Sequence, residues 1–145
     1  MPENASTAFE RIGGQKAVDA LVDVFYRNME SFPEARGIRA MHAEDLEPTR
    51  AALKTYLAEW LGGPRDYSAK KGHPRMRMRH AHLRIGLAER DAWLSCMNAA
   101  LVETIADEPM RHRIGEDLAK LADWMRNDPG NPHDSRHATA DSAKV

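Results

Sequence analysis

The residues best suited to chemistry in this chain gather in one short segment, 72–84, with the sequence GHPRMRMRHAHLR. Imidazole nitrogens can ligate a metal ion, and guanidinium groups bind carboxylates or phosphates. The segment contains no acidic side chain that would neutralise these groups. It therefore predicts a metal site, an anion site or a combination of the two. Its members are the histidines His73, His80 and His82 and the arginines Arg75, Arg77, Arg79 and Arg84.

Several functions compete for this segment. A catalytic zinc site is poorly supported, because no carboxylate or thiolate lies near the histidines and the chain has no HExxH pair. A nucleic-acid surface has the required positive charge, but it lacks interleaved aromatic residues, and the rest of the chain cancels the charge to a net −1. A solvated basic surface without a ligand stays open as the simplest alternative.

A haem site would use both residue types, with one imidazole for the iron and several cations for the propionates. Haem also requires an apolar slot closed by helices, with control over the wall opposite the imidazole. Met76 and Met78 offer adaptable apolar surface beside the histidines. Further apolar wall is available from Phe25, Tyr26, Leu53, Tyr56, Trp93 and Leu94.

Composition places these residues in one soluble globular domain. The chain has 145 residues, 42% of them hydrophobic and 30% charged, with 21 basic and 22 acidic side chains. No apolar run approaches the roughly 20 residues that span a bilayer, and the start MPENAS lacks a secretory pattern, so we expect a cytoplasmic protein without membrane or general nucleic-acid partners. The single cysteine, Cys96, excludes an internal disulfide framework and is expected to be a buried packing residue.

Apolar residues recur at three- and four-residue steps along most of the chain, which predicts amphipathic helices and an all-α fold. The strongest helix covers 15–31, after Gly13-Gly14. Asp45 is the expected N-cap of a helix ending at Gly62-Gly63-Pro64, with Leu53, Tyr56 and Leu57 on its inward face. Further helices are expected at 7–12, 34–41, 88–105 and 109–126, the last with Met125 on its apolar stripe.

Two segments lack such periodicity. Residues 65–74 are predicted to form an irregular loop, and internal loops of that kind often carry function. Residues beyond Asn127 are rich in Pro, Asp, Ser and Ala and are expected to be disordered. The predicted organisation is an extension at 1–6, a domain at 7–127 and a disordered tail at 128–145.

Six motifs in fixed order resemble those of the group II truncated haemoglobins, over about four fifths of the chain. They are FERIGG (9–14), VFYRNM (24–29), MHAEDL (41–46), WLGGPRDYS (60–68), GHPRMRMRH (72–80) and RDAWLSCM (90–97). Each is weak alone, whereas the six together at correct spacing are specific. The resemblance implies a truncated globin, a two-over-two helical sandwich around haem b.

The resemblance also implies roles for single residues. His80 matches the proximal iron ligand, while Tyr26, His42 and Trp93 match the polar distal wall that would control a bound ligand. Either Tyr26 or His42 could make the second distal hydrogen bond beside that of Trp93, and His42 could also bind iron. His82 and His73 are expected near the site or on the surface.

Contacts to the rest of the haem are implied in the same way. Tyr67 and Arg79 match positions that hold the propionates, with Arg75 or Arg77 as helpers. Ala52 stands where many relatives have a basic residue, so that contact is expected to be missing, and His82 replaces a common aromatic or apolar residue. The full set expected to contact the cofactor is Phe25, Thr49, Leu53, Tyr56, Leu57, Tyr67, Met76, Arg79, His80, Leu94 and Met125.

The function implied by the resemblance is binding of O2, NO, CO or other small ligands at haem iron. Distal donors slow oxygen release, which favours nitric oxide or peroxide chemistry or oxygen sensing over bulk transport. A nitric oxide dioxygenase or peroxidase-like activity would need an external reductase, because the chain has no flavin or nicotinamide motif. The alternative is a haem-free helical module that binds an anionic partner through the basic segment 70–84. We expect a monomer or a homodimer.

Overall fold

The computed structural model describes residues 6–128, and this part of the chain is helical with no strand. The predicted extension and tail therefore lie outside the described residues, except Ser6 and Asp128. No helix in this range is long and apolar enough to cross a membrane. The elements are α1 (Ala8–Ile12), α2 (Gln15–Ser31), the 3-10 helix η1 (Pro33–Ala35), α3 (Arg36–Ala40), α4 (Glu47–Trp60), α5 (Asp66–Lys71), α6 (Met76–Arg79), α7 (Leu87–Thr104) and α8 (Glu108–Trp124).

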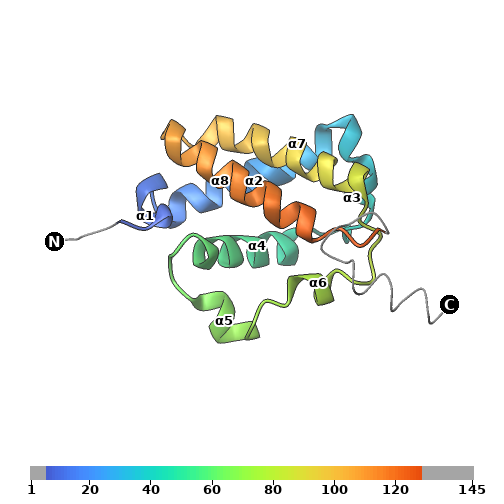
Figure 1. The fold of residues 1–145 in the computed structure, drawn as a ribbon, viewed down its shortest axis with the longest axis horizontal. Coiled ribbons are helices and arrows are strands. Elements are labelled where there is room, and N and C mark those ends of the chain that lie inside the picture. Colours follow the sequence, from blue (N-terminus) through green and yellow to red (C-terminus); the bar gives the residue numbers. More distant parts are fainter. Residues whose placement is uncertain (1–5, 129–145) are drawn as a thin grey trace.

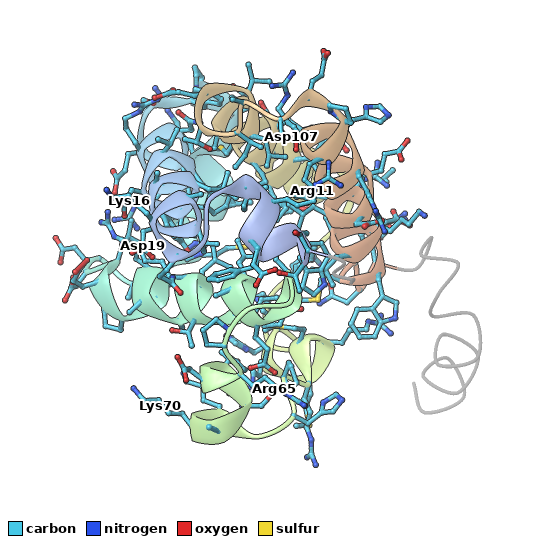
Figure 2. The ribbon with its side chains drawn as sticks, turned by 90° about the vertical axis from the view of Figure 1, so that its left-hand side faces the viewer. Arg11, Lys16, Asp19, Arg65, Lys70 and Asp107 are labelled. Atoms are coloured by element: carbon cyan, nitrogen blue, oxygen red, sulfur yellow. The ribbon has the colours of Figure 1, made fainter. Side chains whose placement is uncertain are left out.

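The four long helices are α2, α4, α7 and α8, and they form two packed pairs, α2 with α4 and α7 with α8 (Figure 1). Helix α2 packs most extensively against α7 and also contacts α4, and α7 packs against α8. Helix α1 closes one end of this assembly, where Arg11 forms an ion pair with Asp107 at 3.2 Å (Figure 2). The short helices α5 and α6 lie beyond α4, on the side away from α7 and α8 (Figure 1). The arrangement confirms the predicted all-α, two-over-two sandwich.

The core is centred on the apolar stripe of α2. Its fully buried members are Val18, Leu21, Val22, Phe25 and Met29, and burial of side chains of this kind contributes about 1.5–3 kcal/mol each. One polar side chain lies among them: the buried Asn28 donates from Nδ2 to the carbonyl of Cys96 on α7 at 3.0 Å. This bond fixes α2 against α7. The bond thereby fixes which residues of α2, on either side of Asn28, lie opposite the RDAWLSCM motif of α7.

Helix ends follow local sequence signals. Thr7 and Glu10 form a capping box before α1, and Gly13 ends it with a left-handed φ of 118°. Asp107 caps α8 by accepting from the backbone N–H of Met110 at 3.1 Å. At α4 the prediction was displaced by one residue: Leu46 occupies the N-cap position, although Asp45 still accepts from the N–H of Glu47 at 3.0 Å.

The prediction of an irregular loop at 65–74 was wrong, because residues 66–71 form α5. The stabilising contacts come from another helix. Glu59 on α4 accepts from the backbone N–H of Ser68 at 2.9 Å and from the Ser68 hydroxyl, and Tyr67 is buried beneath the turn. A six-residue helix with one buried ring has too few apolar positions to show helical periodicity.

Candidate functional site

A cavity of about 510 Å³ lies among helices α2 to α8. This volume is typical of small-molecule and cofactor sites. All the predicted site residues line it except Phe25 and Leu94. The predicted residues at its wall are Tyr26, His42, Thr49, Leu53, Tyr56, Leu57, Tyr67, Met76, Arg79, His80, Trp93 and Met125.

Phe25 acts one layer behind the wall. Its side chain is fully buried, and its ring centroid lies 4.9 Å from that of Tyr26 and 5.2 Å from that of Trp93. Leu94 directly follows Trp93, and consecutive helical residues are rotated by about 100° about the helix axis. The Leu94 side chain therefore points in a different direction from that of Trp93, and it does not line the cavity.

His80 ends the four-residue helix α6 and lines the cavity with a half-buried ring. Its Nδ1 lies 2.7 Å from the carbonyl oxygen of Met76. A carbonyl only accepts, so Nδ1 carries the hydrogen and the lone pair of the neutral ring is on Nε2. Burial lowers the pKa of His80, which favours this neutral form. The nitrogen available to a metal is thus Nε2.

The other two histidines of the segment lie differently. His82 is exposed but still lines the cavity, whereas His73 is exposed and does not. The sequence prediction placed both near the site or on the surface. Among residues 6–128, no group of three or more His, Cys, Asp or Glu side chains is placed to hold a metal ion together.

Three polar side chains gather on another part of the wall. Tyr26 is 3% exposed, and burial raises the pKa of its hydroxyl to about 12 against an opposing effect of Arg50, so the hydroxyl is protonated at neutral pH. The rings of Tyr26 and His42 lie 6.1 Å apart, edge to face. Trp93 on α7 is half-buried, and its indole N–H can only donate a hydrogen bond.

The Nδ1 hydrogen of His42 is already used in a hydrogen bond. Its Nδ1 lies 2.7 Å from the carbonyl oxygen of Ile38, so this nitrogen carries the hydrogen. In the neutral ring Nε2 then only accepts. Trp93 and Tyr26 can therefore donate to a ligand in the cavity, whereas neutral His42 can accept a hydrogen bond from Tyr26 but has no Nε2 hydrogen to give.

Cations and phenol groups occupy the part of the wall formed by α5 and α6. Arg79 lines the cavity, while its guanidinium donates to the carbonyls of Pro74 (2.7 Å) and Lys71 (3.4 Å). Lys71 also lines it, with its ammonium 5.7 Å from the centre of the Tyr67 ring, which in turn packs against Tyr56. Arg75 and Arg77, the predicted helpers, are not among the lining residues. Lys71 is a cation that the sequence prediction missed.

The segment around His80 is held by residues that follow α8. Asn127 donates its backbone N–H to the carbonyl of Ile85 (2.9 Å), accepts from the N–H of Ile85 at Oδ1 (2.8 Å) and donates from Nδ2 to the carbonyl of Leu83 (2.6 Å). On the other side of His80, Arg77 donates to the carbonyl of Arg126 (3.0 Å). A helix of four residues is too short to be stable alone. These bonds therefore fix the position of His80.

Several lining residues were not predicted as site residues. Those on α8 share the stripe of Met125, so helical periodicity could have identified them. Those between α6 and α7 depend on the path of a short connection that shows no periodicity. The residues are Ile38, Met41, Pro48, Ala52, Lys71, His82, Leu83, Ile85, Glu89, Arg90, Leu118, Leu121 and Ala122.

Comparison with known proteins identifies the family. The profile described as bacterial-like globin matches residues 7–127. The chain belongs to the bacterial-like globin family. A group 2 truncated haemoglobin of Bacillus subtilis is 36% identical to this globin over 101 residues, which are 70% of this chain and 74% of the relative.

Solved structures of similar proteins agree. The group II 2-on-2 haemoglobin from Agrobacterium tumefaciens is 42% identical, with a TM-score of 0.84 over 88% of this globin and 98% of that chain. The group II truncated haemoglobin from Bacillus anthracis is 36% identical, with a TM-score of 0.79 over 86% and 94% of the two chains. The predicted resemblance to group II truncated haemoglobins is confirmed.

Proposed function

We propose that this globin binds haem b in the cavity, with Nε2 of His80 as the proximal iron ligand. The observation that carries the proposal is the His80 ring, which is neutral, bonded through Nδ1 to the carbonyl of Met76 and therefore free at Nε2 beside a cavity of about 510 Å³. A ligating histidine typically donates its other ring hydrogen to such a carbonyl. Membership of the globin family supports the same cofactor.

The lining fits the chemistry of haem. Leu57, Met76 and Leu121 are apolar, as a porphyrin ring requires, and Lys71 and Arg79 supply positive charge for two carboxylates. Haem, when bound, supplies an iron atom that can take a diatomic ligand such as O2, NO or CO. Ala52 also lines the wall and carries no charge, so it supplies no cationic contact to the cofactor.

The polar part of the wall determines how long a ligand stays. We assign the main donor role to Trp93, because its indole only donates and it lines the cavity. The Tyr26 hydroxyl donates either to the ligand or to Nε2 of His42. Donors of this kind slow the release of oxygen. We therefore propose a role in nitric oxide or peroxide chemistry or in oxygen sensing, with an external electron donor, rather than in bulk oxygen transport.

Titration of the haem-free protein with haem tests this function against the haem-free alternative. We expect a Soret band that grows to a sharp end point at one haem per chain, and a ferrous form whose spectrum shifts when CO is added. A featureless titration without an end point would contradict haem binding. If the same protein then bound the polyanion heparin through residues 70–84, that result would favour the alternative of a haem-free module that binds an anionic partner.

A further inference from the structure

Positive charge is concentrated on one side of this globin. Residues 65–84 contain seven Lys or Arg side chains and one acidic residue, Asp66, which gives the segment a formal charge of +6. Since the whole chain carries −1, the other 125 residues carry −7. We call the exposed surface of this segment the basic face. Its cations are Arg65, Lys70, Lys71, Arg75, Arg77, Arg79 and Arg84. Lys71 and Arg79 are the two assigned to the haem carboxylates, so Arg65, Lys70, Arg75 and Arg84 are the exposed cations outside the cofactor contacts.

The basic face is exposed and adjoins the cavity. All of its cations except Arg77 have exposed side chains. Figure 2 shows Lys70 on α5 and Arg65 just before it, with α4 between them and Lys16 of α2. The same segment contributes Tyr67, Met76 and His80 to the cavity wall. A partner seated on this face would therefore contact the segment that holds the proposed iron ligand.

Much of this charge has no carboxylate partner in the part of the chain that the structure describes. Among the residues that the structure describes, no carboxylate forms an ion pair with Lys70, Arg75 or Arg84. Elsewhere such pairs are common, for example Arg27 with Glu103 at 2.6 Å and Arg39 with Glu30 at 2.8 Å. Unpaired charges of one sign on one face create a potential that attracts an oppositely charged partner and speeds its association.

We propose that the basic face docks an acidic protein that donates single electrons to the haem, an inference that rests on the proposed function. In the transfer, one electron leaves the donor's reduced centre, which becomes oxidised by one unit, and ferric iron becomes ferrous. No bond is made or broken and no proton is required. The 145 residues given contain no flavin or nicotinamide motif, so they do not themselves supply the electron.

The observations favour a protein over a nucleic acid as the partner. Proteins that bind single strands stack bases on exposed aromatic rings. Tyr67 is the only phenyl, phenol or indole ring among residues 65–84, and it is 4% exposed. The −7 charge of the remaining residues also repels a long polyanion that extends past the basic face. A compact acidic patch on a protein avoids that repulsion.

Two matched charge reversals test the proposal. The double variant Lys70→Glu/Arg84→Glu changes the basic face without touching a cavity-lining residue. The control Lys16→Glu/Lys120→Glu changes two exposed lysines on α2 and α8 and alters the net charge by the same amount. Reduction of the ferric haem-loaded proteins by a prereduced acidic [2Fe–2S] ferredoxin is followed by stopped-flow spectroscopy, at low and at high salt.

We expect the basic-face variant to be reduced about tenfold or more slowly than wild type at low salt, with the difference lost at about 1 M salt. The control should change less than about threefold. A neutral reduced flavin should reduce all three proteins at one rate. The docking proposal would be overturned if reduction were slowed equally in both variants or in neither. It would also be overturned if the basic-face reversal weakened binding of RNA but did not affect the rate of reduction. Absence of haem binding in the wild type would instead remove the proposed function itself.

Discussion

Replacing Trp93 by phenylalanine keeps an aromatic ring on α7 and removes the indole N–H. The ring should still pack on Phe25, whose centroid lies 5.2 Å away, so the wall should keep most of its shape. The lost group is the one side-chain donor on the polar wall that cannot act as an acceptor. The variant therefore separates hydrogen bonding from packing.

The expected size follows from the environment of the indole. Hydrogen bonds to a charged or strongly polarised partner contribute about 1.5–3 kcal/mol, and each 1.4 kcal/mol is one decade in rate. Because Trp93 is half-buried rather than fully buried, we expect the lower end of this range. Oxygen should thus dissociate about tenfold faster from Trp93→Phe. Carbon monoxide is a poorer acceptor, so its dissociation should change little.

Stopped-flow dissociation rates of both gases measure the effect, and His42→Phe is the matched control. Nδ1 of His42 is bonded to the Ile38 carbonyl, so the neutral ring has no hydrogen at Nε2 to lose. Its replacement should leave oxygen release unchanged or slower, since Tyr26 is then released to donate to the ligand. Equal acceleration of both gases in Trp93→Phe would show a steric gate. Faster oxygen release from His42→Phe would show that His42 is the donor.

Three further predictions concern the parts that hold the site. Lys71→Ala and Arg79→Ala should each speed haem transfer to apomyoglobin severalfold, because each removes a cation from the wall; an unchanged rate would make that residue a surface charge. Asn127→Ala should lower the free energy of unfolding by about 1 kcal/mol, because it removes two side-chain hydrogen bonds of an exposed residue, and should shift the iron–histidine Raman band of the ferrous protein. The control Asn98→Ala changes a residue that is likewise exposed but forms no side-chain hydrogen bond with the described residues, and it should do neither. Ion pairs lower the pKa of Asp123, so its contribution to stability is complete above the unfolded-state pKa of about 3.9 and is lost as pH falls further. Urea unfolding should therefore show Asp123→Asn less stable than wild type at pH 6 and equal to it near pH 2; a constant difference would contradict this.

The long helices could be predicted because each buries a continuous apolar stripe. In α2, Val18, Leu21 and Phe25 show the period in the sequence and are fully buried in the structure. Cys96 was predicted to be buried among such residues and is, and burial raises the pKa of its thiol to about 11. Periodicity reports burial directly, which is why these predictions are confirmed.

The short helices could not be predicted in the same way, because distant residues determine them. Helix α5 depends on Glu59, and α6 is tied through Arg77 to the carbonyl of Arg126, which lies 49 residues later in the chain. Lys71, which lines the cavity, is the last residue of α5. A resemblance in motifs could point to His80, but it could not show which carbonyl accepts its hydrogen.

Haem retention by two neighbouring histidine variants tests the central claim most directly. His80→Ala and His82→Ala each remove one imidazole that lines the cavity. Of these two histidines, only His80 has its Nδ1 bonded to a backbone carbonyl, at 2.7 Å. The amount of haem bound per chain after gel filtration is the measurement. We predict that His82→Ala keeps close to one haem per chain and that His80→Ala loses it. Retention by His80→Ala together with loss by His82→Ala would contradict the assignment of the iron ligand.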